Sequence, residues 1–188
     1  MNFFEKILGK ILGKKKSRKK VLVLVDLENI SMNTPLLFPP ANFSLEKAFG
    51  NLTEKIAQEI GAIVGIFVFV PSHQATVWGE IFQRQGYFTI YCPKKKGKNG
   101  EEKDAVDDEL MRFGFKMLDQ MPGLDYLCLV SGDQDFVPLL QEARYHGVKN
   151  IIAAGDLQSL SKELIPLAEK DPNNPKKRRV YLLSDMGD

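Results

Sequence analysis

Acidic side chains follow two apolar, β-branched runs of the chain at the points where those runs end. The first run, VLVLV, is followed directly by Asp26, and the second, LCLV, leads within five residues to Asp133 and Asp135. Such a run between polar residues is typical of a strand buried on both faces, and open parallel sheets bind ligands at the C-terminal ends of their strands. Carboxylates gathered there repel one another unless a cation or a shared proton offsets the repulsion. The two runs therefore predict a divalent-metal site.

A further carboxylate is expected from the segment EEKDAVDDELMRFGFKML, which has the apolar spacing of a helix. Four apolar residues form the stripe that must face the sheet: Val106, Leu110, Phe113 and Met117. Asp107 borders this stripe, about 100° around the helix from Val106, whereas Asp108 lies about 200° away. Asp107 is therefore expected to lean over the sheet edge, and Asp108 takes that place if the helix begins later. Asp104 is the expected N-cap.

The turn SGDQDFVP after the second run supports a structural interpretation as well as a chemical one. Gly132 permits unusual backbone dihedrals, Asp133 or Asp135 can cap the next helix, and Pro138 fits the first turn of that helix. Capping explains one aspartate. It explains neither the second aspartate nor Asp26 at the end of the other run, so both remain metal-site candidates.

Mg²⁺ or Mn²⁺ is the cofactor that these residue types favour. Hard oxygen ligands hold such ions, and the ion both neutralises a phosphodiester and lowers the pKa of a bound water. The chemistry needs no histidine, and neither His73 nor His146 is placed like a general base. A phosphohydrolase that used Asp26 as its nucleophile would want an aspartate at position 28, which is Glu, and no P-loop for nucleotide hydrolysis is present.

Strand and helix patterns alternate from residue 20 onward, which predicts the α/β class. The expected architecture is a three-layer α/β/α domain with a mostly parallel sheet of five or six strands and right-handed crossovers. Strands are expected at 21–26, 62–70, 87–91, 126–130, 148–153 and, as a short last strand, 180–183. Helices are expected at 45–60, 75–85, 104–120, 137–146 and 157–169, with a proline-rich loop at 31–42.

Charge is distributed unevenly along the chain. The first 20 residues hold eight Lys or Arg and one Glu, so the rest of the chain is mildly acidic although the net charge is +2. Residues 1–19 form a basic tail whose apolar residues have helical spacing. This tail is expected either to lie on an anionic membrane surface or a protein partner, or to be a solvated N-terminus. The expected domain is 20–170, followed by a C-terminal extension, 171–188, with a possible short strand.

The cellular location is expected to be the cytoplasm. The chain has two cysteines, Cys92 and Cys128, and no Cys or His partners at the spacing of a zinc site, which fits a reducing compartment. No stretch reaches the roughly 18 apolar residues that a membrane span needs. The broken apolar pattern of the tail is also unlike a secretory signal.

Three segments together resemble a known family. VDLEN, KDAVDDEL and LVSGDQDFVPLLQEARYHGVKNIIAAG resemble the NYN domains, the LabA-like branch of the PIN-like nuclease superfamily, over most of the chain. The resemblance implies a PIN-like, Rossmann-like fold with the first and fourth strands adjacent at the sheet centre. It also implies a Mg²⁺- or Mn²⁺-dependent ribonuclease that hydrolyses RNA, expected to be single-stranded, and a homo-oligomer is possible.

Individual roles follow from matching these motifs. The catalytic and metal-binding residues implied are Asp26, Asp107, Asp133 and Asp135, supported by Asn29, Ser131 and Asp108. One departure is notable, because Phe113, Gly114 and Phe115 stand where the family usually places another aspartate. A catalytically weak or inactive RNA-binding, scaffold or regulatory module is therefore the alternative function. The proline-rich insertion at 30–44 is a second departure.

Substrate binding is expected from a lysine-rich loop, PKKKGKNGEE, which precedes the acidic helix. Its lysines, Lys94, Lys95, Lys96 and Lys98, lie on the side of the sheet where the carboxylates gather and can neutralise RNA phosphates. The alternative is an ordinary solvated loop. A second basic run, PKKRRV at 175–180, resembles a nuclear localisation signal, or its charges protect a sheet edge.

Overall fold

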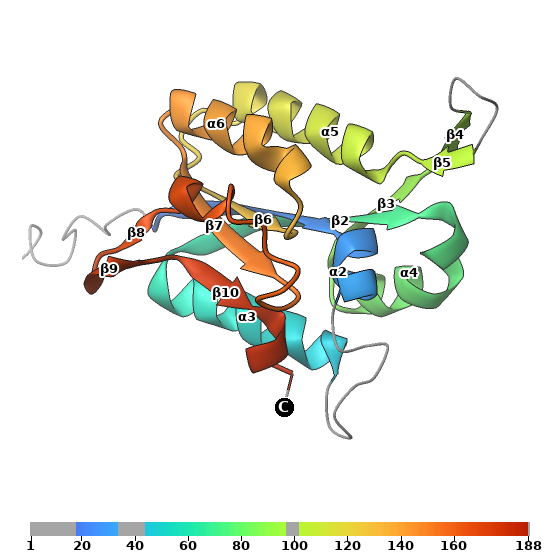
Figure 1. Ribbon diagram of the computed structural model, residues 1–188, viewed down its shortest axis with the longest axis horizontal. Helices are drawn as coiled ribbons and strands as arrows, with labels where there is room; N and C mark the ends of the chain where they lie inside the picture. Colours follow the sequence, from blue (N-terminus) through green and yellow to red (C-terminus); the bar gives the residue numbers. More distant parts are fainter. Residues whose placement is uncertain (1–17, 34–43, 97–101, 188) are drawn as a thin grey trace, which may run out of the picture.

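The computed structural model describes residues 18–33, 44–96 and 102–187, which build six parallel strands into one central sheet (Figure 1). The strand order is β10-β7-β6-β1-β2-β3. The strands are β1 (Lys20–Asp26), β2 (Ala62–Pro71), β3 (Phe88–Cys92), β6 (Tyr126–Val130), β7 (Lys149–Ala154) and β10 (Val180–Leu182). All five neighbouring pairs are parallel, which confirms the predicted sheet.

The centre of the sheet is formed by β1 and β6, as the family resemblance implied. Val21 pairs with Tyr126 and Val25 pairs with Val130. Every residue of β6 is buried, and so is every residue of β1 after Lys20. Because parallel strands end at the same edge, this register brings the residues after Val25 and Val130 side by side.

Helices cover both faces of the sheet and complete the three layers (Figure 1). α5 (Val106–Gln120) and α6 (Val137–Tyr145) pack on one face, while α3 (Leu45–Glu59) and α4 (Ala75–Arg84) pack on the other. Alternate residues of β1 supply the two cores: Leu22 and Leu24 face α5 and α6, and Val23 faces α3. A short helix, α2 (Leu27–Asn33), follows β1 and occupies the start of the segment expected as a loop.

Helix ends follow local chemistry in most places. Ser44 is the N-cap of α3 and accepts a hydrogen bond from the backbone N–H of Lys47 at 3.2 Å. Gly86 and Gly147, after α4 and α6, have positive φ, as expected of glycines that end helices. The prediction for Asp104 is wrong: Ala105 is the N-cap of α5, without a side-chain hydrogen bond, and Asp104 ends a strand.

Two segments differ from the predicted elements. Residues 157–169 form turns and the short 3-10 helix η4 (Ile165–Leu167) in place of the expected helix. The cause is long-range backbone hydrogen bonding: the N–H of Glu169 donates to the carbonyl of Asn150 in β7, and the N–H of Ser161 donates to the carbonyl of Gly132 in the turn after β6. The loop after β3 contains the hairpin β4 (Lys94–Lys96) and β5 (Glu102–Asp104). Another hairpin, β8 (Lys170–Asp171) and β9 (Asn174–Arg178), precedes β10.

Three further 3-10 helices complete the described chain: η2 (Ser72–Gln74), η3 (Gln134–Phe136) and η5 (Leu183–Asp185). No helix within these described ranges is long and apolar enough to cross a lipid bilayer. Residues 1–17 of the basic tail and 34–43 of the proline-rich insertion lie outside the described residues. The role of the tail and the cytoplasmic location stay predictions.

Two helical glycines provide a test of the packing between α5 and the sheet. A Cβ at Gly114 would lie 2.7 Å from the Leu139 side chain and 3.3 Å from Leu24, whereas a Cβ at Gly50 in α3 meets nothing within 4 Å. Gly114→Ala is therefore expected to lower the free energy of unfolding by about 1–3 kcal/mol through overpacking. Gly50→Ala should raise it by about 0.5–1 kcal/mol through helix propensity. Urea denaturation measures both, and equal effects would contradict the tight α5 interface.

Candidate metal centre

Three carboxylates meet at the C-terminal edge of the sheet. Asp107 lies in the first turn of α5, and Asp133 and Asp135 lie in the turn between β6 and α6. One ligand oxygen from each aspartate lies within 4.8 Å of the others. Within the described residues, this is the one group of three or more Asp, Glu, His or Cys side chains close enough to share an ion. We call Asp107, Asp133 and Asp135 the aspartate trio.

Packing of α5 explains why Asp107, and not its neighbour, joins the trio. The buried residues of α5 are Val106, Leu110, Gly114 and Leu118, with Phe113 and Met117 partly buried beside them. This face is rotated slightly from the predicted stripe but leaves Asp107 at its border. Asp108 is exposed and lies outside the trio, although its charge still acts on Asp107.

Asp133, in the turn between β6 and α6, has two roles. Its Oδ1 accepts a hydrogen bond from the backbone N–H of Asp135 at 2.9 Å, which caps η3, and its carboxylate also belongs to the trio. The expected reason for Gly132 is wrong, since its φ is not positive. A Cβ at Gly132 would lie 2.0 Å from the carbonyl oxygen of Ser159, so glycine is required there for space.

Asp26 lies outside the trio and is a buried anchor, with 2% of its surface exposed. Its Oδ1 accepts from the backbone N–H of Asn29 at 3.1 Å, and its Oδ2 accepts from the hydroxyl of Ser131 at 3.0 Å. The side-chain Oδ1 of Asn29 accepts from the backbone N–H of Gly132 at 3.0 Å, and the Ser131 hydroxyl oxygen accepts from the backbone N–H of Asp133 at 3.2 Å. These four hydrogen bonds, the Asp26 network, join the end of β1 to the turn of the trio.

Burial and neighbouring carboxylates raise the pKa values of Asp26 and Asp107. Burial raises the pKa of Asp26 from 3.8 to about 7; the N–H of Asn29 and the hydroxyl of Ser131 oppose this rise, and the charges of Asp107 and Glu28 add to it. The pKa of Asp107 is also raised, first by burial and then by Asp133, Asp135 and Asp108. A cation at this edge would relieve that repulsion. Three oxygen donors in a group of this size fit Mg²⁺ or Mn²⁺.

Two contributors to the site were not identified from the sequence. Glu28 raises the pKa of Asp26, and its place in VDLEN, two residues after Asp26, was a usable signal. Ser159, whose carbonyl rests against Gly132, comes from the segment expected to be helical, so no local pattern indicated it.

The predicted RNA-binding lysines lie partly within the described chain. Lys94 is exposed at the start of β4, and the hairpin β4–β5 leads directly into α5, near the position of Asp107 (Figure 1). Lys95 and Lys96 belong to the same strand, and Lys98 lies outside the described residues. Their contact with RNA stays a prediction.

The raised pKa of Asp26 predicts how the stability of the metal-free protein depends on pH. Between about pH 4 and 7 the folded protein keeps a proton on Asp26 that the unfolded chain has released. The free energy of unfolding should therefore fall as pH rises through this window and level off above about pH 7. Asp26→Asn should flatten this dependence, measured by urea denaturation in EDTA. An unchanged pH dependence in the variant would contradict the assignment.

Two substitutions of Asp133 separate its charge from its cap. Asp133→Asn keeps an Oδ1 acceptor for the N–H of Asp135 but removes the charge, so the metal-free variant should melt at or above the wild-type temperature. Asp133→Ala loses both, and should be less stable than the Asn variant by about 1 kcal/mol. Thermal melting in EDTA compares the three proteins. An Asn variant less stable than wild type would show that the charge itself stabilises the turn.

Comparison with solved structures agrees with this fold. A crystal structure of a Vibrio parahaemolyticus protein of unknown function shares the fold, with a TM-score of 0.67 and 17% identity over 90% of this chain and 94% of that one. A putative aminotransferase from Clostridium difficile aligns with a TM-score of only 0.24 and 11% identity, over 81% of this chain and 27% of that one, and carries no argument. No curated protein gives a significant sequence match.

The family model gives the identity of the domain. The model of the NYN domain matches residues 20–170, a range that includes β1, α5, the turn after β6 and all residues of the trio and the Asp26 network. This family is a domain of the PIN-like nuclease superfamily and indicates a nuclease-type function. Because the match spans most of the 188 residues, the chain belongs to the NYN domain family.

Proposed function

We propose that this protein is a divalent-metal-dependent ribonuclease that hydrolyses phosphodiester bonds of single-stranded RNA. The observation that carries the proposal is the aspartate trio, whose ligand oxygens lie within 4.8 Å of one another at the C-terminal edge of the sheet. A phosphodiester is an anion, so a bare cluster of carboxylates would repel it. The same cluster attracts it once a divalent cation is bound.

Each residue has a defined part in the proposed reaction. Asp107, Asp133 and Asp135 would hold Mg²⁺ or Mn²⁺, with Asp26 as a further predicted ligand. The ion would neutralise the scissile phosphate and lower the pKa of a bound water. Asp26 also orients the Ser131 hydroxyl, and the Ser131 oxygen in turn holds the N–H of Asp133. Asn29 fixes the same turn through the N–H of Gly132.

The remaining assignments belong to this proposal. Lys94, Lys95, Lys96 and Lys98 contact the RNA backbone next to Asp107, and Asp108 helps to position the substrate. Residues 20–170 form the nuclease domain, 171–188 the C-terminal extension, and 1–19 a basic tail that directs the protein to an anionic membrane or a partner. We place the protein in the cytoplasm, with LabA-like proteins as its branch of the family and a homo-oligomer as a possible assembly.

One observation favours a second candidate, a non-catalytic RNA-binding or scaffold module. Phe113 packs against Phe67 at 4.6 Å and Phe69 at 5.5 Å between ring centroids, and Gly114 has no space for a side chain. Positions 113 and 114 of α5 therefore supply no further carboxylate to the site. Whether the trio and Asp26 suffice for turnover decides between the two candidates.

Metal binding and cleavage test the proposal together. Wild-type protein should bind Mn²⁺ in calorimetry and cut a labelled single-stranded RNA in Mg²⁺ or Mn²⁺ but not in EDTA. Asp107→Asn should weaken Mn²⁺ binding by about 100-fold or more, because loss of even a supporting partner of a ligand costs about 10–100-fold. Cleavage should be lost in parallel.

A matched control lies on the same helix. Asp119→Asn makes the same change of charge at the far end of α5, where Asp119 is exposed beside His146, and should leave Mn²⁺ binding and cleavage unchanged. Mn²⁺ binding without any cleavage would favour the non-catalytic module. Absence of both Mn²⁺ binding and cleavage in the wild type would overturn the metal centre.

A further inference from the structure

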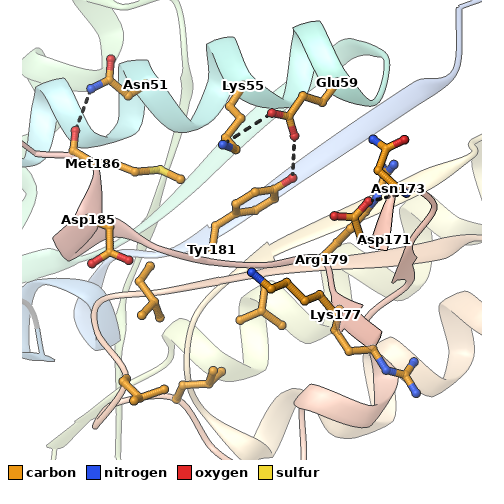
Figure 2. A pocket seen from close by; sticks show the side chains of 15 residues that line it. Asn51, Lys55, Glu59, Asp171, Asn173, Lys177, Arg179, Tyr181, Asp185 and Met186 are labelled. Atoms are coloured by element: carbon orange, nitrogen blue, oxygen red, sulfur yellow. Dashed lines mark hydrogen bonds and ion pairs between the residues drawn. The ribbon is translucent and has the colours of Figure 1, made fainter. Parts of the chain in front are cut away.

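A groove of about 840 Å³ lies on the face of the sheet opposite α5, between α3 and β10. Figure 2 shows the Tyr181 ring in the groove, with Lys55 and Glu59 of α3 on one side of it and Lys177 on the other. The β8–β9 hairpin closes one end of the groove, and Asp185 lies near the opposite end. Residues 177–180 of the basic run PKKRRV line this groove.

The charged side chains of the groove are unequally paired. The ammonium of Lys177 has no hydrogen bond or ion pair within the described part of the chain, and the Arg179 guanidinium lies 5.5 Å from the Tyr126 ring centre with its Nη1 buried and without a hydrogen-bond partner. By contrast, Glu59 is neutralised by Lys55 at 3.4 Å. Asp171 accepts the N–H of Asn173 at 2.8 Å, inside the hairpin, and keeps its charge. Among the described residues, the groove is lined by four cations and three anions, so a ligand meets a small excess of positive charge, with Asp171 and Asp185 as the unpaired opposing charges: Lys55, Lys177, Arg178 and Arg179 against Glu59, Asp171 and Asp185.

Tyr181 adds a surface suited to a nucleobase. Its hydroxyl lies 3.5 Å from the Glu59 carboxylate, and the Lys55 ammonium lies 5.8 Å from its ring centre, so two residues on one face of α3 hold the ring in place. Burial and the charge of Glu59 raise the pKa of Tyr181 to about 12, so the hydroxyl stays neutral and donates. A fixed aromatic ring beside free cations is the arrangement with which proteins bind single strands of nucleic acid.

The groove also starts next to the turn of the aspartate trio. Leu160 lines the groove, and its Cα lies 3.2 Å from the position that a Cβ of Gly132 would occupy. Leu157, which is 71% exposed, lines the same end. A strand that leaves the carboxylates across this edge would pass Leu157 and enter the groove.

We propose that the groove binds the sugar–phosphate backbone of a single nucleic-acid strand, with Lys177 and Arg179 on the phosphates and Tyr181 against a base. The inference rests on the proposed function, since the strand is the part of the RNA substrate that extends beyond the cleavage position. The groove thereby accounts for three of the four cations that follow Pro175, since Lys177, Arg178 and Arg179 line it.

Two adjacent lysines give a matched test. Lys177 lines the groove, whereas Lys176 is exposed on the same strand and does not line it. The affinity for a labelled single-stranded RNA of about 20 nucleotides is measured by fluorescence anisotropy in EDTA across a salt series. Lys177→Ala should weaken binding about three- to tenfold at low salt and reduce the log–log salt slope by about 0.7. Lys176→Ala should change neither, and melting temperatures confirm that both variants fold.

Variants of Tyr181 and a shorter RNA test how the groove contacts the strand. Tyr181→Phe keeps the ring and should bind like wild type, whereas Tyr181→Leu should lose affinity for the long RNA. A tetranucleotide is too short to occupy both the carboxylates and the groove, and the metal-free carboxylates repel it, so in EDTA it should bind more weakly than the long RNA and its binding should still depend on Lys177.

The outcomes separate the groove from the proposed reaction. Equal losses in Lys176→Ala and Lys177→Ala would show general attraction to the hairpin and overturn the groove site, as would no loss in either. An RNA that the wild type binds through Lys177 but never cuts in Mn²⁺ would leave the groove supported and the ribonuclease proposal contradicted. If the wild type cuts an RNA in Mn²⁺ while both lysine variants bind that RNA like wild type, the ribonuclease proposal is supported and the groove site is contradicted.

Discussion

The hydrogen bond from the Ser131 hydroxyl to the buried carboxylate of Asp26 connects the two halves of this protein's site. It forms because β1 and β6 are parallel neighbours in a register that pairs Val25 with Val130. The next residue of each strand is then the polar one. A carboxylate at 2% exposure is costly without partners, and the backbone N–H of Asn29 supplies the second one. Asp26 therefore fixes the position of the turn that carries Asp133 and Asp135, through the Ser131 hydroxyl.

The site concentrates like charges that a stability-optimised protein would avoid. Asp107, Asp133 and Asp135 share one small region, and Asp26 lies close enough for its pKa to respond to Asp107. The fold offsets part of this repulsion locally, because Asp133 also caps η3 and Asp26 accepts two hydrogen bonds. The part that remains is what a divalent cation would relieve. Local strain of this kind is typical of functional sites.

One face of the sheet positions Asp107, and the opposite face carries the groove. On one face, α5 packs through Gly114 against Leu139 and Leu24, and this close approach sets where Asp107 emerges. On the other face, the groove around Tyr181 lies between α3 and β10, where the Tyr181 hydroxyl lies 3.5 Å from the Glu59 carboxylate. The loop after β7 links the two regions, because its Ser159 carbonyl presses on Gly132 while Leu160 lines the groove.

Local patterns in the sequence were enough to predict the parallel sheet, the helices that border it and the residues that gather at its edge. Asp26, Asp133 and Asp135 follow buried runs, and Asp107 borders an apolar stripe, so period and position alone indicated them. The patterns failed where long-range pairing overrode propensity. Residues 157–169 have helical spacing, yet their backbone groups bond to Asn150 and Gly132, far away in the chain.

Tertiary structure alone decided how the candidate residues divide their roles. Sequence spacing could not separate the trio from Asp26, because burial and hydrogen bonding, which make Asp26 an anchor, depend on strand register and on the packing of α2. It also could not explain Gly132, whose missing side chain makes room for a carbonyl 27 residues later in the chain. Sequence spacing likewise could not predict the groove beside Tyr181, since it is bounded by α3 and β10, two elements that meet only in the folded protein. The sequence determined which chemical groups reach the sheet edge, and the fold decided their distances, burial and charge.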